Sequence, residues 1–215
     1  ESPCGAPGSS GTLLFLDWDN TLFPTTEIFD RWGLCTHSMI SSPKHMAQEQ
    51  TNGLRAWEDA LYEYLLVCIS ISSECTILTN SQRPWVSTSI ARFAPKVKPL
   101  LGKDGPVKVI YAGEVLEQRR GRTGRSVQPV RSADMENKTS SSETDKKEAK
   151  YVAMKQAVKK FRARHLGQPI KNIMSIGDDW YEHDAAQEVA SQCSEGSDVH
   201  VKTFITPGTP TISEL

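Results

Sequence analysis

The most informative stretch of the 215-residue chain is residues 14–22, which read Leu14-Phe15-Leu16-Asp17-Trp18-Asp19-Asn20-Thr21-Leu22. This apolar run predicts a buried strand, and it ends in an Asp-x-Asp-x-Thr pattern. In open α/β sheets, ligands bind beyond the carboxyl ends of the strands, so both acids leave the core where a site would form. Side chains two apart on an extended segment share a side, about 7 Å apart along the strand. Asp17 and Asp19 can therefore share a metal or act in sequence on one substrate; the alternative interpretation is a turn and helix cap.

The rest of the chain alternates between strand and helix patterns. Short apolar runs predict strands at Thr12–Asp17, Cys75–Thr79, Val107–Tyr111, Asn172–Ile176 and Val199–Ile205. Apolar residues at three-to-four spacing predict helices over Gly53–Ser72 and Pro84–Leu101. A third helix is predicted to start at a capping pair, Asp145 and Glu148, and to end near Gly167. This alternation is typical of an α/β fold, so we expect a three-layer, Rossmann-like parallel sheet with helices on both faces.

Length and composition indicate a single domain over residues 1–215. Residues 117–149 hold only five hydrophobic residues and are rich in Arg, Ser, Thr and Lys, so we expect a mobile Arg/Ser-rich insertion within the domain. Phe23–Asn52 has few periodic apolar positions. We expect this segment to wrap the carboxyl edge of the sheet as a loop with a short helix.

Charge, hydropathy and cysteine content exclude several classes of protein. The net charge of −1 argues against a globally basic nucleic-acid binder and against an acidic disordered protein. The longest uncharged apolar-leaning run, Tyr64–Ser73, is far shorter than the roughly 18 residues of a membrane span, so we expect none. Five cysteines without a C-x-x-C pair suggest neither a disulfide framework nor a zinc site. We therefore expect reduced thiols in an intracellular, cytoplasmic protein, whose start at Glu1 rather than Met we interpret as trimming.

A second acidic cluster follows the predicted strand Asn172–Ile176, in the order Gly177-Asp178-Asp179. A parallel sheet brings the carboxyl ends of its strands to one edge, so these acids can converge with Asp17 and Asp19. Four uncompensated carboxylates in one crevice would repel, which favours a bound divalent cation, and oxygen-only ligation indicates Mg²⁺. The alternative is an acidic helix start that the helix dipole stabilises.

Two further segments supply groups suited to an anionic ligand. Thr79 and Asn80 end a predicted strand, and Lys150 borders the apolar stripe of the third predicted helix. A hydroxyl donor and an ammonium suit a phosphoryl group held against a metal, although each residue alone can also be a cap or a surface group. Lys146 and Lys147, one turn earlier, are alternative candidates for the lysine.

This order of motifs resembles the haloacid dehalogenase superfamily of phosphohydrolases, over nearly the whole chain from Leu13 to the last strand. A narrower pattern is similar to an uncharacterised eukaryotic branch of that superfamily: Leu16-Asp17-Trp18-Asp19-Asn20-Thr21-Leu22-Phe23-Pro24, with Thr79-Asn80, Trp85-Val86 and Gly177-Asp178-Asp179-x-x-Glu182. The stretches between the motifs lack the helices or strands of a full cap domain. The resemblance therefore implies a capless or minimally capped phosphatase with an open site.

The resemblance also implies a role for each catalytic position. Asp17 would attack phosphorus and form an aspartyl-phosphate. Asp19 would protonate the leaving oxygen and then activate water, which favours phosphatase over dehalogenase chemistry. Thr79 would hydrogen-bond the phosphoryl group, with Asn80 beside it in the substrate site. Lys150 would neutralise that group and orient Asp17.

A magnesium ion is implied by the same resemblance. Asp17, Asp178 and the backbone carbonyl of Asp19 would hold the ion, and Asp179 and Glu182 would support these ligands.

The substrate and the partners are less defined by the sequence. An open site suits a phosphoprotein, or a phosphorylated small molecule if Phe23–Asn52 closes over the crevice. The segment Arg119–Arg131 contains five Arg and no acid, and is either a solvated loop or a contact for RNA, anionic lipid or an acidic protein. The alternative to an enzyme is a catalytically silent scaffold that uses this Arg-rich loop.

Three residues near the acids have weaker interpretations. Trp18 and Trp180 either flank a substrate or pack with one edge in solvent. His183 has no partner evident in the sequence, so a surface or helix-cap position is expected.

Overall fold

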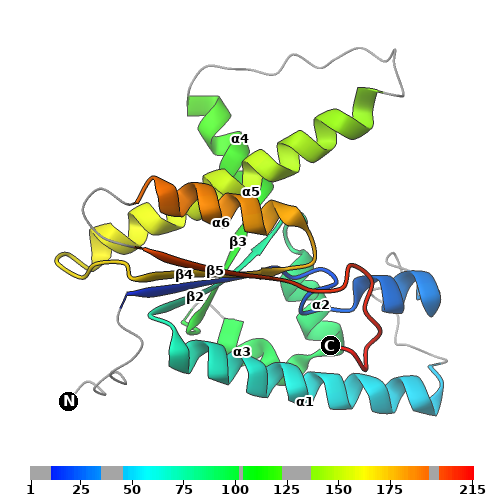
Figure 1. The fold of residues 1–215 in the computed structure, drawn as a ribbon. Coiled ribbons are helices and arrows are strands. Elements are labelled where there is room, and N and C mark those ends of the chain that lie inside the picture. The colour runs from blue at the N-terminus through cyan, green and yellow to red at the C-terminus, as the bar shows by residue number, and fades with distance from the viewer. Residues whose placement is uncertain (1–10, 35–45, 102–103, 123–136, 194–198) are drawn as a thin grey trace.

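A five-stranded, all-parallel sheet forms the centre of the fold (Figure 1). The computed structural model describes residues 11–34, 46–101, 104–122, 137–193 and 199–215. The strands lie in the order β3-β2-β1-β4-β5, with the bounds Thr12–Leu16 (β1), Glu74–Thr79 (β2), Val107–Tyr111 (β3), Asn172–Gly177 (β4) and His200–Ile205 (β5). Because β1 is central, the residues that follow it lie between the ends of β2 and β4.

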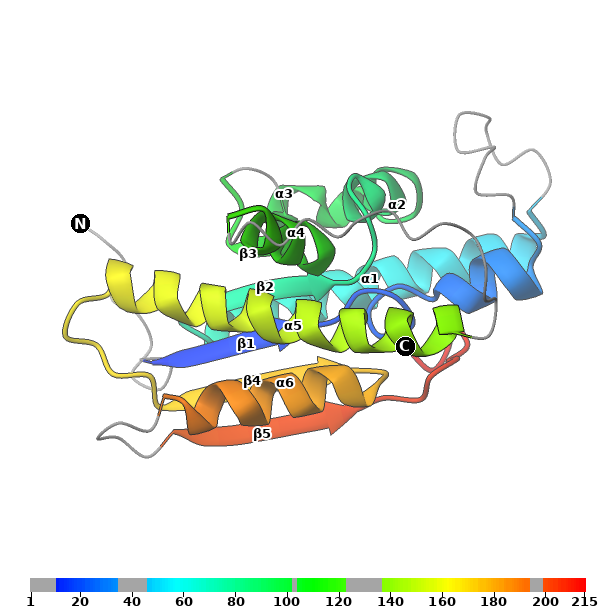
Figure 2. The ribbon, with the colours of Figure 1, turned by 90° about the horizontal axis from the view of Figure 1, so that it is seen from above.

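Helices cover both faces of the sheet (Figure 1). One face carries α1 (Gln48–Ile71), α2 (Trp85–Phe93), the 3-10 helix η3 (Pro95–Val97) and α3 (Lys98–Leu101). The other face carries α4 (Ala112–Arg122), α5 (Asn137–Arg164) and α6 (Trp180–Ser191), with α5 and α6 side by side over the strands (Figure 2). The chain is therefore a three-layer α/β fold, as the sequence predicts.

Each face of the sheet has its own hydrophobic core, and β1 contributes to both. Leu14 and Leu16 pack towards α1, whereas Leu13 and Phe15 pack towards α5. Successive side chains of a strand point to opposite faces, and both faces are covered here, so every residue of β1 is buried. This double coverage explains why the strand is a continuous apolar run in the sequence.

Two predicted helices have wrong boundaries on the α1 face. α1 begins at Gln48 rather than at Gly53, and Ala47 N–H before it donates to Gln50 Oε1 at 2.9 Å. The helix predicted over Pro84–Leu101 is broken into α2, η3 and α3. The break falls at Ala94, whose φ is −144°, because the following Pro95 disfavours the helical conformation at the residue before it.

The predicted start of the third helix is also wrong. α5 begins at Asn137, so Asp145 and Glu148 lie within it rather than at its cap. Both carboxylates instead accept from the Arg120 guanidinium of α4, at 2.7 and 2.8 Å. The helix ends at Arg164, shortly before Gly167, whose φ of +85° lies in the left-handed region.

The two segments without a regular pattern are only partly described. Residues 117–122 belong to α4 and residues 137–149 to α5, whereas residues 123–136 of the predicted insertion lie outside the described residues. Within Phe23–Asn52, the described parts contain the five-residue π-helix η1 (Glu27–Arg31) and the start of α1. Neither segment forms a separate cap domain within the described residues. No helix in those residues is both long and apolar enough to cross a membrane.

Candidate active site

The residues after β1 form a tight turn at the carboxyl edge of the sheet. The backbone oxygen of Trp18 accepts hydrogen bonds from the N–H groups of Leu22 (3.0 Å) and Phe23 (2.8 Å). Asn20 adopts a φ of +55°, a conformation that Asn tolerates better than most residues, and its Oδ1 accepts from Thr26 N–H at 3.0 Å. The rings of Trp18 and Phe23 stack in the core with centroids 5.6 Å apart. The turn is therefore anchored to the core on one side and fixed by its own hydrogen bonds.

Asp17 lies at the end of β1 in contact with a buried lysine. Asp17, Lys150 and Glu182 are only 6%, 1% and 4% exposed. Lys150 Nζ forms ion pairs with Asp17 Oδ1 and with Glu182 Oε1, the latter at 2.5 Å, and donates to the backbone oxygen of Leu78 in β2. An ammonium group has three donors, and these contacts use all three. Lys150 therefore joins β1, β2 and α6 at one point.

The carboxylates of this group outnumber its one buried cation. Burial raises the pKa of Asp17 to about 7; Lys150 opposes this shift, and Glu182 adds to it. Burial also raises the pKa of Asp178 to about 6, again with a contribution from Glu182. Burial alone would lower the pKa of Lys150, but the two carboxylates that it contacts more than offset this, so its pKa lies above its ordinary value. The excess negative charge favours binding of a proton or a cation.

Asp19 is held by four hydrogen-bond donors. Its Oδ1 accepts from Thr25 Oγ1 and from Trp85 Nε1, both at 2.7 Å. Its Oδ2 accepts from Ser81 Oγ at 2.6 Å and from Thr79 Oγ1 at 3.3 Å. The donors come from the segment after β1, the end of β2 and the start of α2, so three parts of the fold fix the orientation of this carboxylate.

β2 brings Thr79 and Asn80 to the same edge of the sheet. Thr79 is buried, and its hydroxyl donates to Asp19 while it accepts from Ser81 N–H at 2.9 Å. Asn80 is half-buried beside it. The contact of Thr79 with Asp19 is the longest of the four, so it is the one that a substrate oxygen would most readily replace.

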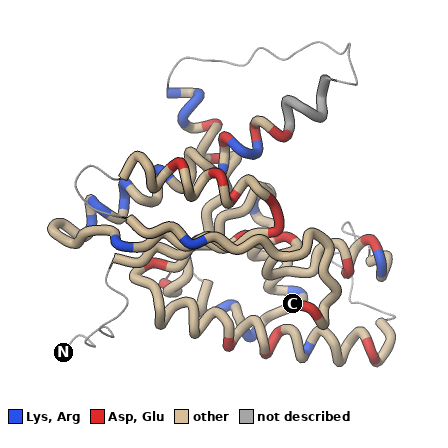
Figure 3. The backbone as a smooth tube through the Cα atoms, viewed as in Figure 1, with Lys and Arg blue, Asp and Glu red and all other residues tan. Residues whose placement is uncertain are grey.

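Acidic residues also gather where β4 passes into α6 (Figure 3). Asp178 is half-buried, burial and the nearby Glu182 raise its pKa, and its own charge contributes to the raised pKa of Asp17. Asp179 is the N-cap of α6, where its Oδ1 accepts from Trp180 N–H at 2.6 Å. Gly177 makes room for Glu182, because a Cβ at position 177 would lie 2.7 Å from Glu182 Cγ.

The three candidate lysines occupy different positions. Lys150 reaches Asp17, whereas Lys147 pairs with Asp184 at 2.5 Å and Lys146 is exposed. The helical period explains the difference, since Lys150 lies on the face of α5 that packs against the sheet.

Trp18, Trp180 and His183 differ in how far they are exposed to solvent. Trp18 is fully buried and its Nε1 donates to Ser89 Oγ at 3.2 Å, so it is a packing residue rather than a substrate contact. Trp180 is 63% exposed. His183 is half-buried near the start of α6, and its Nδ1 lies 2.6 Å from Thr203 Oγ1, which connects α6 to β5.

Sequence reasoning missed three donors to Asp19: Thr25, Ser81 and Trp85. Trp85 belongs to the Trp85-Val86 pair of the family resemblance, which marked the position without assigning it a role. Ser81 lies two residues beyond a strand end, where a hydroxyl can reach the same edge as Thr79. Thr25 follows a proline in a segment without periodicity, so no sequence signal pointed to it.

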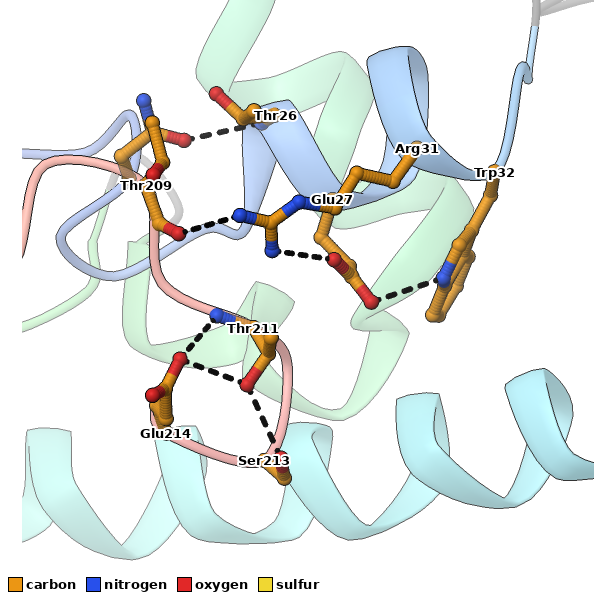
Figure 4. Close-up of polar contacts among 9 residues, drawn as sticks. Thr26, Glu27, Arg31, Trp32, Thr209, Thr211, Ser213 and Glu214 are labelled. Atoms are coloured by element: carbon orange, nitrogen blue, oxygen red, sulfur yellow. Dashed lines mark hydrogen bonds and ion pairs between the residues drawn. The ribbon is translucent and has the colours of Figure 1, made fainter.

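The C-terminal segment braces the residues that follow the turn (Figure 4). Arg31 of η1 forms an ion pair with Glu27 at 2.7 Å and donates to the backbone oxygen of Thr209 at 2.9 Å. Trp32 Nε1 donates to the other oxygen of Glu27 at 3.0 Å. Thr25, which donates to Asp19, lies just before η1. The contacts of Arg31 and Trp32 therefore fix the other end of the segment that begins at Thr25.

The oxygen donors at this edge fit a magnesium ion. Asp17 and Asp178 supply carboxylate oxygens, and no hydrogen bond within the described residues uses the backbone oxygen of Asp19. Glu182 Oε2 is buried without a hydrogen-bond partner in that part of the chain. Magnesium is usually held by one or two carboxylates and keeps several waters. Such a site needs no cluster of three His, Cys, Asp or Glu side chains, and the described residues contain none.

Comparison of this chain with protein-family models, with curated proteins and with solved structures finds no match.

The buried ion pairs predict a large effect of removing the lysine. Lys150→Met should lower the free energy of unfolding at pH 7 by about 3–5 kcal/mol, because two buried carboxylates lose their cation. Lys147→Met is the matched control and should have little effect on stability, since its pair with Asp184 is exposed. Urea unfolding with a chelator present measures both. Equal losses in the two variants would contradict the role assigned to Lys150.

The raised pKa of Asp178 predicts a pH-dependent effect on stability. The folded chain holds the Asp178 proton up to pH about 6, whereas the unfolded chain loses it near pH 4, so this group destabilises the fold progressively as pH rises between these values. Asp178→Asn cannot ionise. In the presence of a chelator it should therefore stabilise the fold at pH 7 by on the order of 1 kcal/mol, after allowance for solvent screening, and have little effect at pH 4.

Urea titrations of the wild type and of Asp178→Asn at both pH values measure this difference, with Asp104→Asn as an exposed control. A stabilisation of the same size at pH 4 and pH 7 would rule out the proposed cause.

Proposed function

We propose that the chain is a magnesium-dependent phosphatase that hydrolyses a phosphate monoester through an aspartyl-phosphate on Asp17. The observation that carries the proposal is the pairing of two differently held carboxylates at the end of β1. Asp17 is buried against Lys150, and Asp19, two residues later, is oriented by four neutral donors. Two carboxylates in different environments suit a nucleophile and a single group that acts as both general acid and general base.

In the first step, a carboxylate oxygen of Asp17 bonds to phosphorus, and the bond between phosphorus and the ester oxygen breaks. Asp19 acts as the general acid and gives a proton to that leaving oxygen. In the second step, Asp19 takes a proton from water while the water oxygen bonds to phosphorus, and the bond between Asp17 and phosphorus breaks. The products are the free alcohol and inorganic phosphate.

Lys150 has two tasks in this scheme. It holds Asp17 by one oxygen, which leaves the other oxygen to attack, and its positive charge offsets the negative charge of the incoming phosphoryl group. Thr79 and Asn80 contact the phosphoryl oxygens from the end of β2. Glu182 and the backbone oxygen of Leu78 keep the Lys150 ammonium in place.

Asp17, Asp178 and the backbone oxygen of Asp19 would hold the magnesium ion, with Asp179 and Glu182 as their supports. When bound, the ion supplies positive charge that reduces repulsion between the Asp17 carboxylate and the anionic substrate. Its affinity should rise with pH as Asp17 and Asp178 lose their protons.

The substrate class follows from the access to the site. The described residues contain no cap domain over the edge of the sheet, so we infer a phosphoprotein or a small phosphate ester that enters from solvent. An intracellular location belongs to the same proposal, since Cys68, Cys75 and Cys193 are free thiols. A silent scaffold is less favoured, because none of the acids of the proposed mechanism is missing.

The proposal predicts the effect of removing each acid. With magnesium and an aryl phosphate, Asp17→Asn should reduce hydrolysis to the background rate, because the variant has no nucleophile. Asp19→Asn should reduce kcat by about 10²–10⁴-fold, the usual contribution of a general acid–base group. Asp104→Asn, an exposed control, should leave the rate unchanged. Activity that survives Asp17→Asn in a preparation free of other phosphatases would refute the assignment.

A further inference from the structure

A groove of about 440 Å³ lies between α4 and α5. Four cations line it, Arg119 and Arg122 from α4 and Lys155 and Lys159 from α5. The Arg residues belong to the basic segment evident in the sequence, whereas the Lys residues come from a helix far along the chain. The fold therefore assembles a basic site that the linear sequence only half reveals.

The groove carries uncompensated positive charge. No carboxylate lines it, and Arg122, Lys155 and Lys159 form no ion pair within the described residues. The hydrogen bonds of Lys155 Nζ go to two neutral oxygens just outside the groove, Gln192 Oε1 at 2.7 Å and the Tyr151 hydroxyl at 3.1 Å, so they do not neutralise its charge. The nearby acids of α5 are already bound to Arg120. An anionic ligand would thus meet cations from both helices.

The other lining residues favour a peptide over a nucleic acid or a membrane. Val115 is half-buried above the buried Val152 and provides an aliphatic contact, and the amides of Gln118 and Gln156 can both donate to and accept from a peptide backbone. No described aromatic ring lines the groove, so bases have nothing to stack on. A concave site between two helices also suits a chain segment better than a flat lipid surface.

The groove is separate from the proposed active site. Lys150 faces the sheet, whereas Val152, Lys155 and Lys159 lie on the opposite side of α5, where α4 crosses it. Figure 3 shows basic residues at the end of α4, on the outer side of the helical layer. An occupant would leave the carboxyl edge of the sheet open.

We propose that this groove binds an acidic peptide segment of a partner protein, in which carboxylates flank an aliphatic side chain. The aliphatic side chain packs on Val115, and the carboxylates pair with Arg122, Lys155 and Lys159. Such an exosite would recruit a protein independently of the chemistry at Asp17.

Fluorescence anisotropy with a short labelled peptide that alternates Glu and Leu tests this proposal. The wild-type protein should bind the peptide, with an affinity that falls as salt rises, and should bind its Gln-for-Glu analogue at least tenfold more weakly. The double variant Lys155→Glu with Lys159→Glu should lose at least tenfold in affinity. The matched control, Lys171→Glu with Lys202→Glu, changes exposed lysines outside the groove and should bind as the wild type does.

Thermal unfolding by circular dichroism verifies that the variants fold, which is expected because Lys155 and Lys159 are exposed. Equal peptide binding by the wild type and the groove variant would overturn the proposal. Loss of binding on replacement of Arg125 and Arg131 by Ser, with the groove variant unaffected, would overturn it in favour of the Arg-rich segment. Tighter binding to a poly-uridine oligonucleotide or to phosphatidylserine vesicles than to the peptide would also overturn it.

Discussion

Burial of the Lys150 ammonium between Asp17 and Glu182 is the interaction on which the candidate site depends. The three groups come from α5, β1 and α6, and the backbone oxygen of Leu78 adds β2. Moving these charges out of water is costly, so the arrangement is stable only where the surrounding sheet and helices hold all of them together. Burial raises the pKa values of Asp17 and Asp178, and the neighbouring carboxylate of Glu182 adds to both shifts because one cation does not offset several acids. A cluster that is unfavourable by itself is well suited to bind a further cation.

The second carboxylate is controlled by hydrogen bonds rather than by ion pairs. Asp19 lies in a turn whose geometry depends on Asn20 and on the packing of Trp18 against Phe23. Its donors reach it from parts of the chain that only the parallel sheet brings together. The difference between charged neighbours at Asp17 and neutral donors at Asp19 gives the two acids different chemistry, although they are two residues apart. The proposed mechanism uses this difference.

The sheet and the strand-end acids could be predicted from the sequence because they depend on local patterns. The central strands β1 and β2 are buried on both faces and are therefore largely continuous apolar runs, and a parallel sheet brings the carboxyl ends of its strands to one edge. Helix boundaries also depend on contacts between helices. Asp145 and Glu148 resemble a capping pair in the sequence, but both lie within α5 and form ion pairs with Arg120 of α4. Ser81 and the basic groove were missed for the same reason: the residues that meet there are distant in the sequence. Thr25 is only six residues from Asp19, but it lies in a segment without a periodic pattern.

Direct detection of phosphorylated Asp17 tests the central claim most directly. An aryl phosphate with a good leaving group needs no proton from Asp19, so Asp19→Asn should form the aspartyl-phosphate and hydrolyse it slowly. Borohydride reduces an acyl phosphate to an alcohol, which converts a modified aspartate to homoserine. Peptide mass spectrometry of this variant, after incubation with magnesium and the aryl phosphate, should find homoserine at position 17. Release of the aryl alcohol with position 17 unmodified, or with homoserine at another aspartate, would contradict the account.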